Sequence, residues 1–392
     1  MKILFDGVYH NNRRDCYTLH INRAVIYQNN LPLKIPFKHA SSGYIDSLEE
    51  IYLKLEADDG TVGFGEVRGN CSYFTGDTTE AVIATLKSAI LPVLFEIDLT
   101  NINQTHDKIE NAIVGNMASK AIADIAIYDL ISKYYGLPLW NLLGGARKMR
   151  LPTEENIPFC SLEETRKNAK ALLDDGCRFI KVRVGLKPFQ KDVERVKAVY
   201  EVVKQLHLES ETEIAIDANQ SWETKEALVN IKVLQQYGLK IVEQPVPAKH
   251  ADSLRMLHEN LDVKIFADEA VFSVDDLVNL INENAIDGLH IKLIKSGGIY
   301  NAVRMMDIAE AHHLSYMVGG MDEGMLAVAA AVQCGAVSRT NLFELNGHCR
   351  IKEDPCSGLE VSHSTVMVPT GIGLGIHVNE KQLHEIYKEN RN

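Results

Sequence analysis

From residue 151 onwards a short apolar segment alternates with an amphipathic one, and this alternation restricts the possible folds more than any other feature of the sequence. Apolar residues recur at helical spacing between the apolar segments, as at Val193, Val196, Val199 and Val203. Strands that alternate with helices form parallel sheets, and eight such units favour closure into a barrel. We therefore predict an α/β fold, a modified (β/α) barrel of the TIM type, with strands at residues 151–157, 178–184, 213–217, 239–243, 263–268, 288–293, 314–318 and 341–345.

The chain before this region has a different pattern, which predicts a separate α+β unit. Three apolar or alternating segments have the composition of strands, at residues 17–28, 51–57 and 62–66. From Thr78 to Tyr134 the apolar spacing becomes helical. We expect an N-terminal α+β capping domain over residues 1–147, a barrel over residues 148–365, and a segment over residues 366–392 that ends in a helix and packs back on the capping domain.

Charge and composition narrow the possible partners. Acidic residues outnumber basic ones by 53 to 41, which gives a formal charge of −12, and no block of lysine and arginine suggests a nucleic-acid partner. No apolar run approaches the roughly 18 residues of a membrane span, and the N-terminus does not have the pattern of a signal segment, so we expect a cytoplasmic protein without a membrane partner. The seven cysteines are scattered and form no C-x-x-C pair, which argues against a disulfide framework or a thiolate zinc site.

Three consecutive predicted barrel strands end in an acid, namely Asp217, Glu243 and Asp268. Neighbouring parallel strands end at the same rim, so these carboxylates would converge and repel one another unless a cation shared them. Oxygen ligands suit Mg²⁺, which also keeps positions free for water or substrate. Any one of these acids taken alone would more simply be a loop or helix cap, whereas three in succession favour a magnesium site.

Basic residues are predicted to face this site from two sides. Alternation along the second strand puts Lys181 and Arg183 on the same face, and Lys292 lies near the end of the sixth strand. Strands two and six lie opposite one another in a ring of eight, so Lys292 would face the other two across the metal. An inward lysine can also be structural, with its ammonium reaching solvent, and Lys264 illustrates that alternative.

Taken together, these features resemble the enolase superfamily, specifically its muconate-lactonizing-enzyme subgroup, which includes dipeptide epimerases. The resemblance rests on the lysine motif at Lys181, the acid series, Lys292 with the following Ile294-Lys295-Ser296-Gly297-Gly298, and the order of capping domain and barrel. It implies removal of a proton α to a carboxylate, with one Mg²⁺ per active site stabilising the enolate and lysines acting as acid and base. As a base Lys292 must be neutral, so we expect its pKa to be lowered by burial near Mg²⁺ and other cations.

Two departures from the family pattern bear on the reaction. Arg183 stands where the family usually has a second lysine, and a guanidinium is a better carboxylate clamp than a proton acceptor. Lys292 would then act as a single base, in a dehydration or a cycloisomerisation, unless Lys181 reaches the substrate as a second base. Where dipeptide epimerases carry Asp-x-Asp on the eighth strand, this chain has Glu344 and Asn346, and Glu344 can still bind an amine.

Further candidates for substrate contact follow from position. Glu323 resembles an acid found after the seventh strand in the subgroup, although an acid at a helix N-terminus has the same pattern. Asn219 follows the first ligand acid. By resemblance, specificity comes from two loops of the capping domain, at residues 36–43 and 66–74, whose polar side chains would suit an anionic or hydroxylated substrate unless they only decorate the surface. These side chains are Lys38, His39, Arg68 and Tyr73.

We therefore expect a racemase or epimerase of an amino-acid-like or small carboxylate substrate, acting as a homo-oligomer. Dehydration or cycloisomerisation with Lys292 as single base is the alternative chemistry. A different class is a non-catalytic relative that uses the barrel as a binding or scaffold module. A Schiff-base aldolase is a further alternative, against which the three acids argue.

Overall fold

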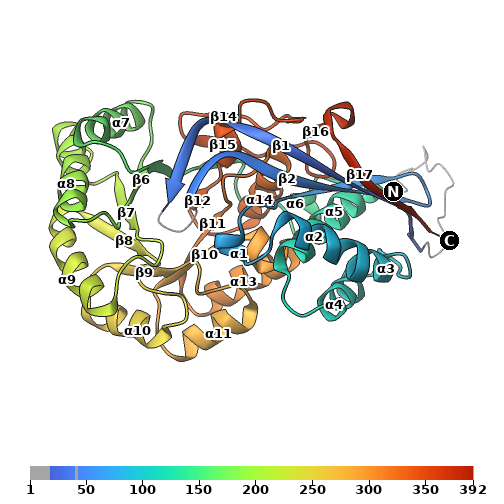
Figure 1. The fold of residues 1–392 in the computed structure, drawn as a ribbon, viewed down its shortest axis with the longest axis horizontal. Helices are drawn as coiled ribbons and strands as arrows, with labels where there is room; N and C mark the ends of the chain where they lie inside the picture. Colours follow the sequence, from blue (N-terminus) through green and yellow to red (C-terminus); the bar gives the residue numbers. More distant parts are fainter. Residues whose placement is uncertain (1–17, 40–42, 392) are drawn as a thin grey trace, which may run out of the picture.

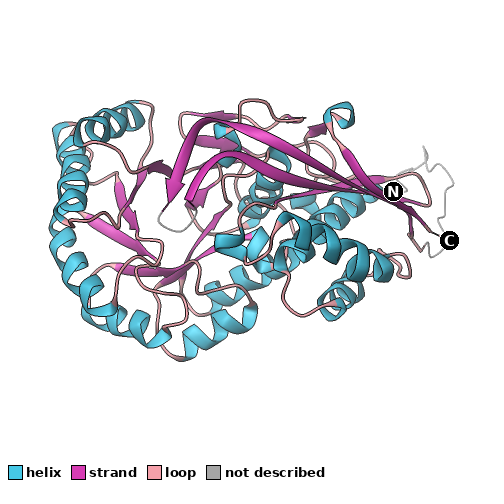
Figure 2. Ribbon diagram, in the orientation of Figure 1, coloured by secondary structure: helices cyan, strands magenta, loops and turns pink. Residues whose placement is uncertain are grey.

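An eight-stranded parallel sheet curls into a nearly closed barrel in the computed structural model, which describes residues 18–39 and 43–391 (Figures 1 and 2). The strands neighbour one another in sequence order and match the predicted segments closely, so the predicted barrel is confirmed. They are β5 (Glu155–Ile157), β6 (Phe179–Arg183), β7 (Glu213–Asp217), β8 (Leu239–Glu243), β9 (Lys264–Ala267), β10 (Gly288–Lys292), β11 (Ser315–Gly319) and β12 (Leu342–Glu344).

The barrel closes between its last and first strands without a regular ladder. Glu154 donates a backbone hydrogen bond of 2.6 Å to the carbonyl of Phe343, and the amide of Leu345 donates to Thr153 Oγ1 at 2.9 Å. The predicted first strand is therefore divided in two. Its first half, β4 (Arg150–Pro152), pairs instead with β15 (Thr365–Met367), which also pairs with β14 (Val361–Ser362).

Helices surround the barrel and connect its strands (Figure 1). Their apolar faces pack on the outward side chains of the sheet in one continuous core. These helices are α7 (Leu162–Asp174), α8 (Gln190–Gln205), α9 (Thr224–Leu234), α10 (Ala251–Asn260), α11 (Val274–Asn282), α12 (Leu293–Ser296), α13 (Ile299–Ala311) and α14 (Met325–Val337), with short 3₁₀ turns at η2 (Gln235–Tyr237) and η3 (Gly347–Arg350).

Inside the barrel an apolar layer lies beneath a charged one. The apolar layer consists of Phe179, Ala215, Ile241, Phe266 and Met317. Two residues farther along four of these strands come Lys181, Asp217, Glu243 and Asp268. The period of two along a strand therefore seals the bottom of the barrel with hydrocarbon and places charge at its C-terminal mouth, where the low dielectric beneath strengthens electrostatic interactions.

The capping domain combines an antiparallel sheet with helices. Its sheet has the order β17-β1-β2-β3, and helix α5 packs on β3. Gly63 and Gly65 make this packing possible, because a Cβ at either position would collide with the backbone of α5. The elements are β1 (Ile21–His39), β2 (Gly43–Ala57), β3 (Val62–Arg68), α1 (Ser72–Thr75), α2 (Thr79–Thr85), the π-helical η1 (Leu86–Ile90), α3 (Leu91–Leu94), α4 (Ile102–Ala112), α5 (Met117–Tyr135) and α6 (Leu139–Leu142).

The end of the chain is a strand, so the expected final helix is wrong. Strand β17 (Glu385–Asn390) pairs antiparallel with β1, with Val25 opposite Lys388. Glutamate and lysine favour helices locally, but the free edge of β1 supplies backbone hydrogen bonds that outweigh this weak preference. Before it come β13 (Cys356–Ser357), which pairs with β16 (His377–Val378), and the turn η4 (Glu380–Gln382).

The long hairpin of β1 and β2 reaches over the barrel (Figure 1). It contacts the segment after β12, where Leu33 forms a β-bridge with Ile351 and Lys34 Nζ donates to the carbonyl of Cys349 at 2.8 Å. None of the helices in the described part of the chain is both long and apolar enough to cross a membrane.

Candidate active site

The predicted acid series lies buried at the C-terminal mouth of the barrel. Asp217 and Glu243 are register partners at the ends of β7 and β8, and Asp268 directly follows β9. One carboxylate oxygen each of Glu243 and Asp268 and a ring nitrogen of His290 lie within 4.8 Å of one another. The carboxylate of Asp217 forms an ion pair with Arg183. The structure therefore groups Glu243 and Asp268 with His290, and places Asp217 on the adjacent strand.

The neighbouring groups determine the charge of these acids. Burial alone would raise the pKa of Glu243, but Lys181 and His290 hold it below its ordinary value. Burial is likewise outweighed at Asp268, where Lys292 and Lys295 lower the pKa. Burial raises the pKa of Asp217 to about 6 because Arg183 offsets only part of the effect.

This set of donors fits a hard divalent cation. The carboxylates of Glu243 and Asp268 are held ionised, and oxygen is the ligand that Mg²⁺ prefers. His290 Nδ1 lies 2.8 Å from Glu243 Oε1, which orients that carboxylate, and the buried Nε2 has no hydrogen-bond partner among the described residues. Burial, together with the nearby charge of Lys292, lowers the pKa of His290 and so favours its neutral imidazole.

Lys181 lies within the charged layer rather than at its surface. Its Nζ is 2.9 Å from Glu154, 2.7 Å from Glu243 and 3.2 Å from Glu344, and its side chain is fully buried. Burial disfavours the ammonium, but the three carboxylates outweigh it and hold the pKa of Lys181 well above its ordinary value. Lys181 is therefore a permanent positive charge that binds three acids together.

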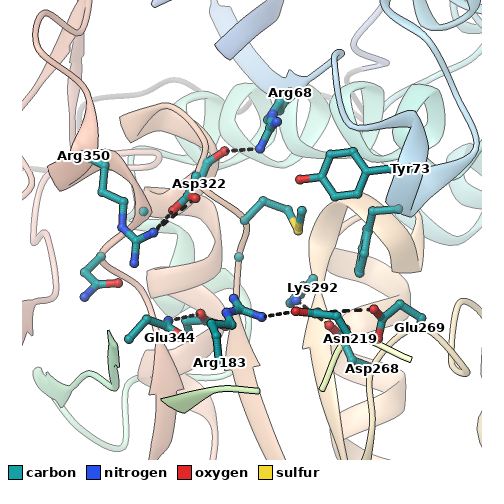
Figure 3. Close-up of a pocket in the computed structure, with 16 residues that line it drawn as sticks. Arg68, Tyr73, Arg183, Asn219, Asp268, Glu269, Lys292, Asp322, Glu344 and Arg350 are labelled. Atoms are coloured by element: carbon teal, nitrogen blue, oxygen red, sulfur yellow. Dashed lines mark hydrogen bonds and ion pairs between the residues drawn. The ribbon is translucent and has the colours of Figure 1, made fainter. Parts of the chain in front are cut away.

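Above the charged layer lies a cavity between the barrel and the capping domain (Figure 3). Arg183 lines it, is ion-paired with Asp217 and donates from Nη1 to Asn219 Oδ1 at 2.9 Å. Burial would lower the pKa of Arg183, but Asp217 and Glu344 hold it above its ordinary value. Arg183 is thus suited to binding negative charge and not to accepting a proton.

Lys292 also lines the cavity. It is the only lysine among the described residues that line it. Its Nζ lies 2.6 Å from Asp268 Oδ2 and 4.8 Å from the ring centroid of Phe74, which comes from the capping domain. The fall in its pKa expected beside bound Mg²⁺ stays a prediction, and the protein groups alone shift this pKa in the opposite direction. Burial does disfavour the ammonium, but the carboxylate of Asp268 outweighs it and holds the pKa of Lys292 above its ordinary value.

The structure separates the predicted substrate contacts into two groups. Four of them line the cavity, namely Arg68, Tyr73, Asn219 and Glu344. Glu323 is not among the described lining residues. It is buried against Gly320, and burial raises its pKa to about 7. Lys38 and His39 belong to β1, but their side chains lie outside the described residues.

Several polar residues of the site were missed in the sequence. His290 precedes Lys292 by two positions, so strand alternation could have placed both on the same face. Glu154 directly precedes β5 and pairs with Lys181. Asp322 lines the cavity from the loop after β11 and Arg350 lines it from η3, and nothing in the local pattern of either segment indicates it.

Comparison with known proteins agrees with this architecture. The model of the mandelate racemase / muconate lactonizing enzyme N-terminal domain matches residues 21–144, and that of the enolase C-terminal domain-like family matches residues 164–382. The chain belongs to the enolase superfamily, in its muconate-lactonizing-enzyme subgroup.

Its relatives are isomerases. An L-Ala-D/L-Glu epimerase of Clostridium acetobutylicum is 34% identical over 360 residues, which cover 91% of this chain and 98% of the relative. An N-succinyl-L-Arg/Lys racemase of Bacillus cereus is 30% identical over 363 residues, which cover 92% and 96%. The crystal structure of a dipeptide epimerase from Cytophaga hutchinsonii, complexed with Mg and the dipeptide D-Ala-L-Val, has a TM-score of 0.87 at 26% identity and covers 95% of this chain and 100% of that one. Because cycloisomerases also occur among the relatives, membership of the superfamily makes this chain an enzyme without fixing its substrate.

Proposed function

We propose that the protein removes the proton α to the carboxylate of a small, amino-acid-like substrate in a Mg²⁺-dependent reaction, with Lys292 as the base. The observation that carries this proposal is the position of Lys292. Its amine lines the cavity directly beside Asp268, and Arg183 lies on the same floor to bind the reacting carboxylate (Figure 3).

Asp217, Glu243 and Asp268 would hold the metal. Bound Mg²⁺ would supply positive charge for the oxygens of the substrate carboxylate as the α-proton leaves. In the structure the carboxylate of Asp268 pairs with the ammonium of Lys292 and raises the pKa of this lysine. A cation that shares this carboxylate would weaken the attraction, so the pKa of Lys292 would fall toward the range of a useful base.

Other residues around the site fix the charge and orientation of the proposed metal ligands and shield Lys292 from water. Lys181 and His290 keep Glu243 ionised and oriented. The apolar layer beneath excludes water, and Phe74 covers the amine of Lys292 from the side of the capping domain. Glu344, Asn219 and Tyr73 line the cavity and would contact the substrate, and contacts from Glu323, Lys38 and His39 are proposed likewise.

Racemisation or epimerisation is the outcome that the relatives favour. The relative with 34% identity is named for epimerisation of a dipeptide, and the relative with 30% identity is named as a racemase of N-succinylated amino acids. Both names describe inversion at a carbon next to a carboxylate. An amino-acid-like acid is therefore the proposed substrate class.

A second candidate is a reaction that needs only one base, such as dehydration of a hydroxy acid or cycloisomerisation. It is favoured by Arg183, which takes the position of the second base and remains charged beside Asp217. Lys181 cannot easily replace it, because three carboxylates hold its ammonium inside the barrel.

Incubation with a library of single-enantiomer carboxylates in D₂O and Mg²⁺ tests the proposal. A racemase or epimerase incorporates deuterium at the α-carbon and inverts it, which mass spectrometry and chiral chromatography detect. A one-base enzyme gives an unsaturated or cyclised product without inversion. If no compound is labelled or converted, whether or not Mg²⁺ is added, the proposed chemistry is wrong and a binding role is favoured.

A further inference from the structure

The cavity wall opposite Lys292 carries two arginines with one carboxylate between them (Figure 3). Arg68 lies at the end of β3 in the capping domain, and Arg350 lies in η3 after the last barrel strand. Asp322, in the loop after β11, contacts both. Its carbonyl accepts from Arg68 Nη1 at 3.4 Å, and its Oδ1 lies 3.1 Å from Arg350 Nη1. This group of three residues joins the two domains at the upper side of the cavity.

The guanidinium of Arg68 is bonded only to neutral acceptors among the described residues. Its Nε donates to Asn70 Oδ1 at 2.8 Å and its Nη2 to Asn70 O at 3.2 Å, and the third acceptor is the carbonyl of Asp322. The two aromatic rings next to the guanidinium are also neutral. Arg68 Cζ lies 5.9 Å from the ring centroid of Phe37 and 5.8 Å from that of Tyr73. The positive charge of Arg68 therefore has no ion-pair partner in the described part of the chain.

The surrounding acidic groups do not supply the missing charge. Glu50 faces Arg68 across the β2–β3 pair, but neither of its carboxylate oxygens has a hydrogen-bond partner among the described residues, and burial raises its pKa well above the ordinary value. Burial likewise raises the pKa values of Tyr73 and Cys71, so both stay neutral. Asp322 is the remaining acidic neighbour, and its carboxylate pairs with Arg350. Two guanidinium groups thus lie next to Asp322 at the cavity wall, and its carboxylate pairs with only one of them, that of Arg350.

Arg68 and Arg350 together carry one more positive charge than Asp322 can balance, and this excess favours the binding of an anion at the cavity wall. Arg68 is only 1% exposed although it lines the cavity, and a buried charge without a partner is unfavourable unless a ligand compensates it. Arg350 is more accessible, with 34% of its side chain exposed, and engages Asp322 through Nη1, so its other donors can reach a ligand. Hydrogen bonds between guanidinium and carboxylate are short, directional and stronger than neutral ones.

We propose that Arg68 and Arg350 form an anion-binding subsite that takes a second carboxylate of the substrate. This inference rests on the proposed function and narrows it, since the substrate class becomes dicarboxylic acids. The reacting carboxylate lies on the barrel floor beside Lys292 and Arg183, and the second carboxylate lies at the upper wall. Arg68 of the capping domain and Arg350 of the barrel then together distinguish a dicarboxylic acid from its monoamide.

A pair of probes that differ only in the second carboxylate tests the subsite. L-Ala-L-Glu and L-Ala-L-Gln share the α-carboxylate and have side chains of nearly the same shape. The α-proton exchange of the acid in D₂O with Mg²⁺ is expected to exceed that of the amide by at least about tenfold in kcat/KM. Arg350→Gln is expected to remove this preference by slowing the acid alone, and Arg350→Lys to restore part of it.

Arg255→Gln is the matched control. Arg255 also pairs with an aspartate, Asp252 at 2.6 Å, but on the outer helix α10, so its loss should leave the preference unchanged. If wild type exchanges the acid and the amide equally well and Arg350→Gln changes neither rate, the subsite is refuted while the proposed function stands.

Direct binding separates the two proposals further. The Mg²⁺-loaded protein is titrated calorimetrically with glutarate and with its monoamide, glutaramate. Preferential binding of glutarate that Arg350→Gln abolishes supports the subsite even if no compound exchanges its α-proton, in which case only the proposed chemistry fails. Equal affinity for both probes in wild type and variant overturns the subsite.

Discussion

Replacing Lys292 by alanine should remove most of the proton exchange without removing the metal site. A positioned general base contributes typically about 10²- to 10⁴-fold to a rate. We expect the loss toward the upper end, because Arg183 and Glu344, which also line the cavity, are poor substitutes for the base. Arg183 stays protonated, and the pKa of Glu344, though burial alone would raise it, is held below its ordinary value by Lys181 and His290. A loss of about 10³- to 10⁴-fold corresponds to about 4 to 5 kcal/mol of transition-state stabilisation.

The assay is the rate of deuterium incorporation at the α-carbon, measured by mass spectrometry with saturating Mg²⁺. The substitution leaves Asp268 paired with Lys295 at 2.8 Å, so the carboxylate is not left alone and the variant should still fold and bind Mg²⁺. Lys264→Ala is the matched control, because Lys264 begins β9, is exposed and bonds only to Ser315 among the described residues. Exchange by Lys292→Ala within about tenfold of wild type would refute its role as base.

Three further predictions concern the metal, the packing and the pH dependence. Chelation with EDTA should abolish exchange, and Asp217→Asn should raise the Mg²⁺ concentration for half-maximal exchange by about tenfold or more because a ligand loses its charge; an unchanged titration would remove Asp217 from the metal site. Gly298→Ala should lower the free energy of unfolding in urea by at least about 1–3 kcal/mol, since Gly298 has a φ of +112° and a Cβ would collide with the carboxylate of Asp124. Gly115→Ala, at a φ of +68° with open space around it, should cost less, and equal costs would contradict the packing argument. Burial raises the pKa of Asp124 to about 7 from 3.8, so the folded protein binds this proton more tightly than the unfolded chain and stability should fall as the pH rises from about 4 to about 7. Asp124→Asn should flatten this part of the profile in denaturation at successive pH values, and parallel profiles would show that Asp124 does not contribute.

The barrel could be predicted because its sequence pattern is local. Most of the strands are buried on both sides and are therefore short apolar runs, and six of them, β6 to β10 and β12, end in an acid or a base or directly before one. Asp217, Glu243 and Asp268 were identifiable for this reason, as was Lys292. The exceptions are segments whose structure depends on a distant edge. Strand β17 forms because β1 offers it hydrogen bonds, and the first predicted strand divides because its first half pairs with β15.

The sequence by itself determined which elements form and which charged residues reach the C-terminal mouth, since both follow from periodicity along single strands and helices. Only the tertiary structure decided which charges face one another. Lys181 is enclosed by acids from three other segments of the barrel, whereas Lys292 contacts Asp268 and lines the cavity. Arg68 and Arg350 meet at Asp322 although 282 positions separate them. Electrostatic interactions depend on distance and burial in space, and neither quantity is encoded in the local pattern of the chain.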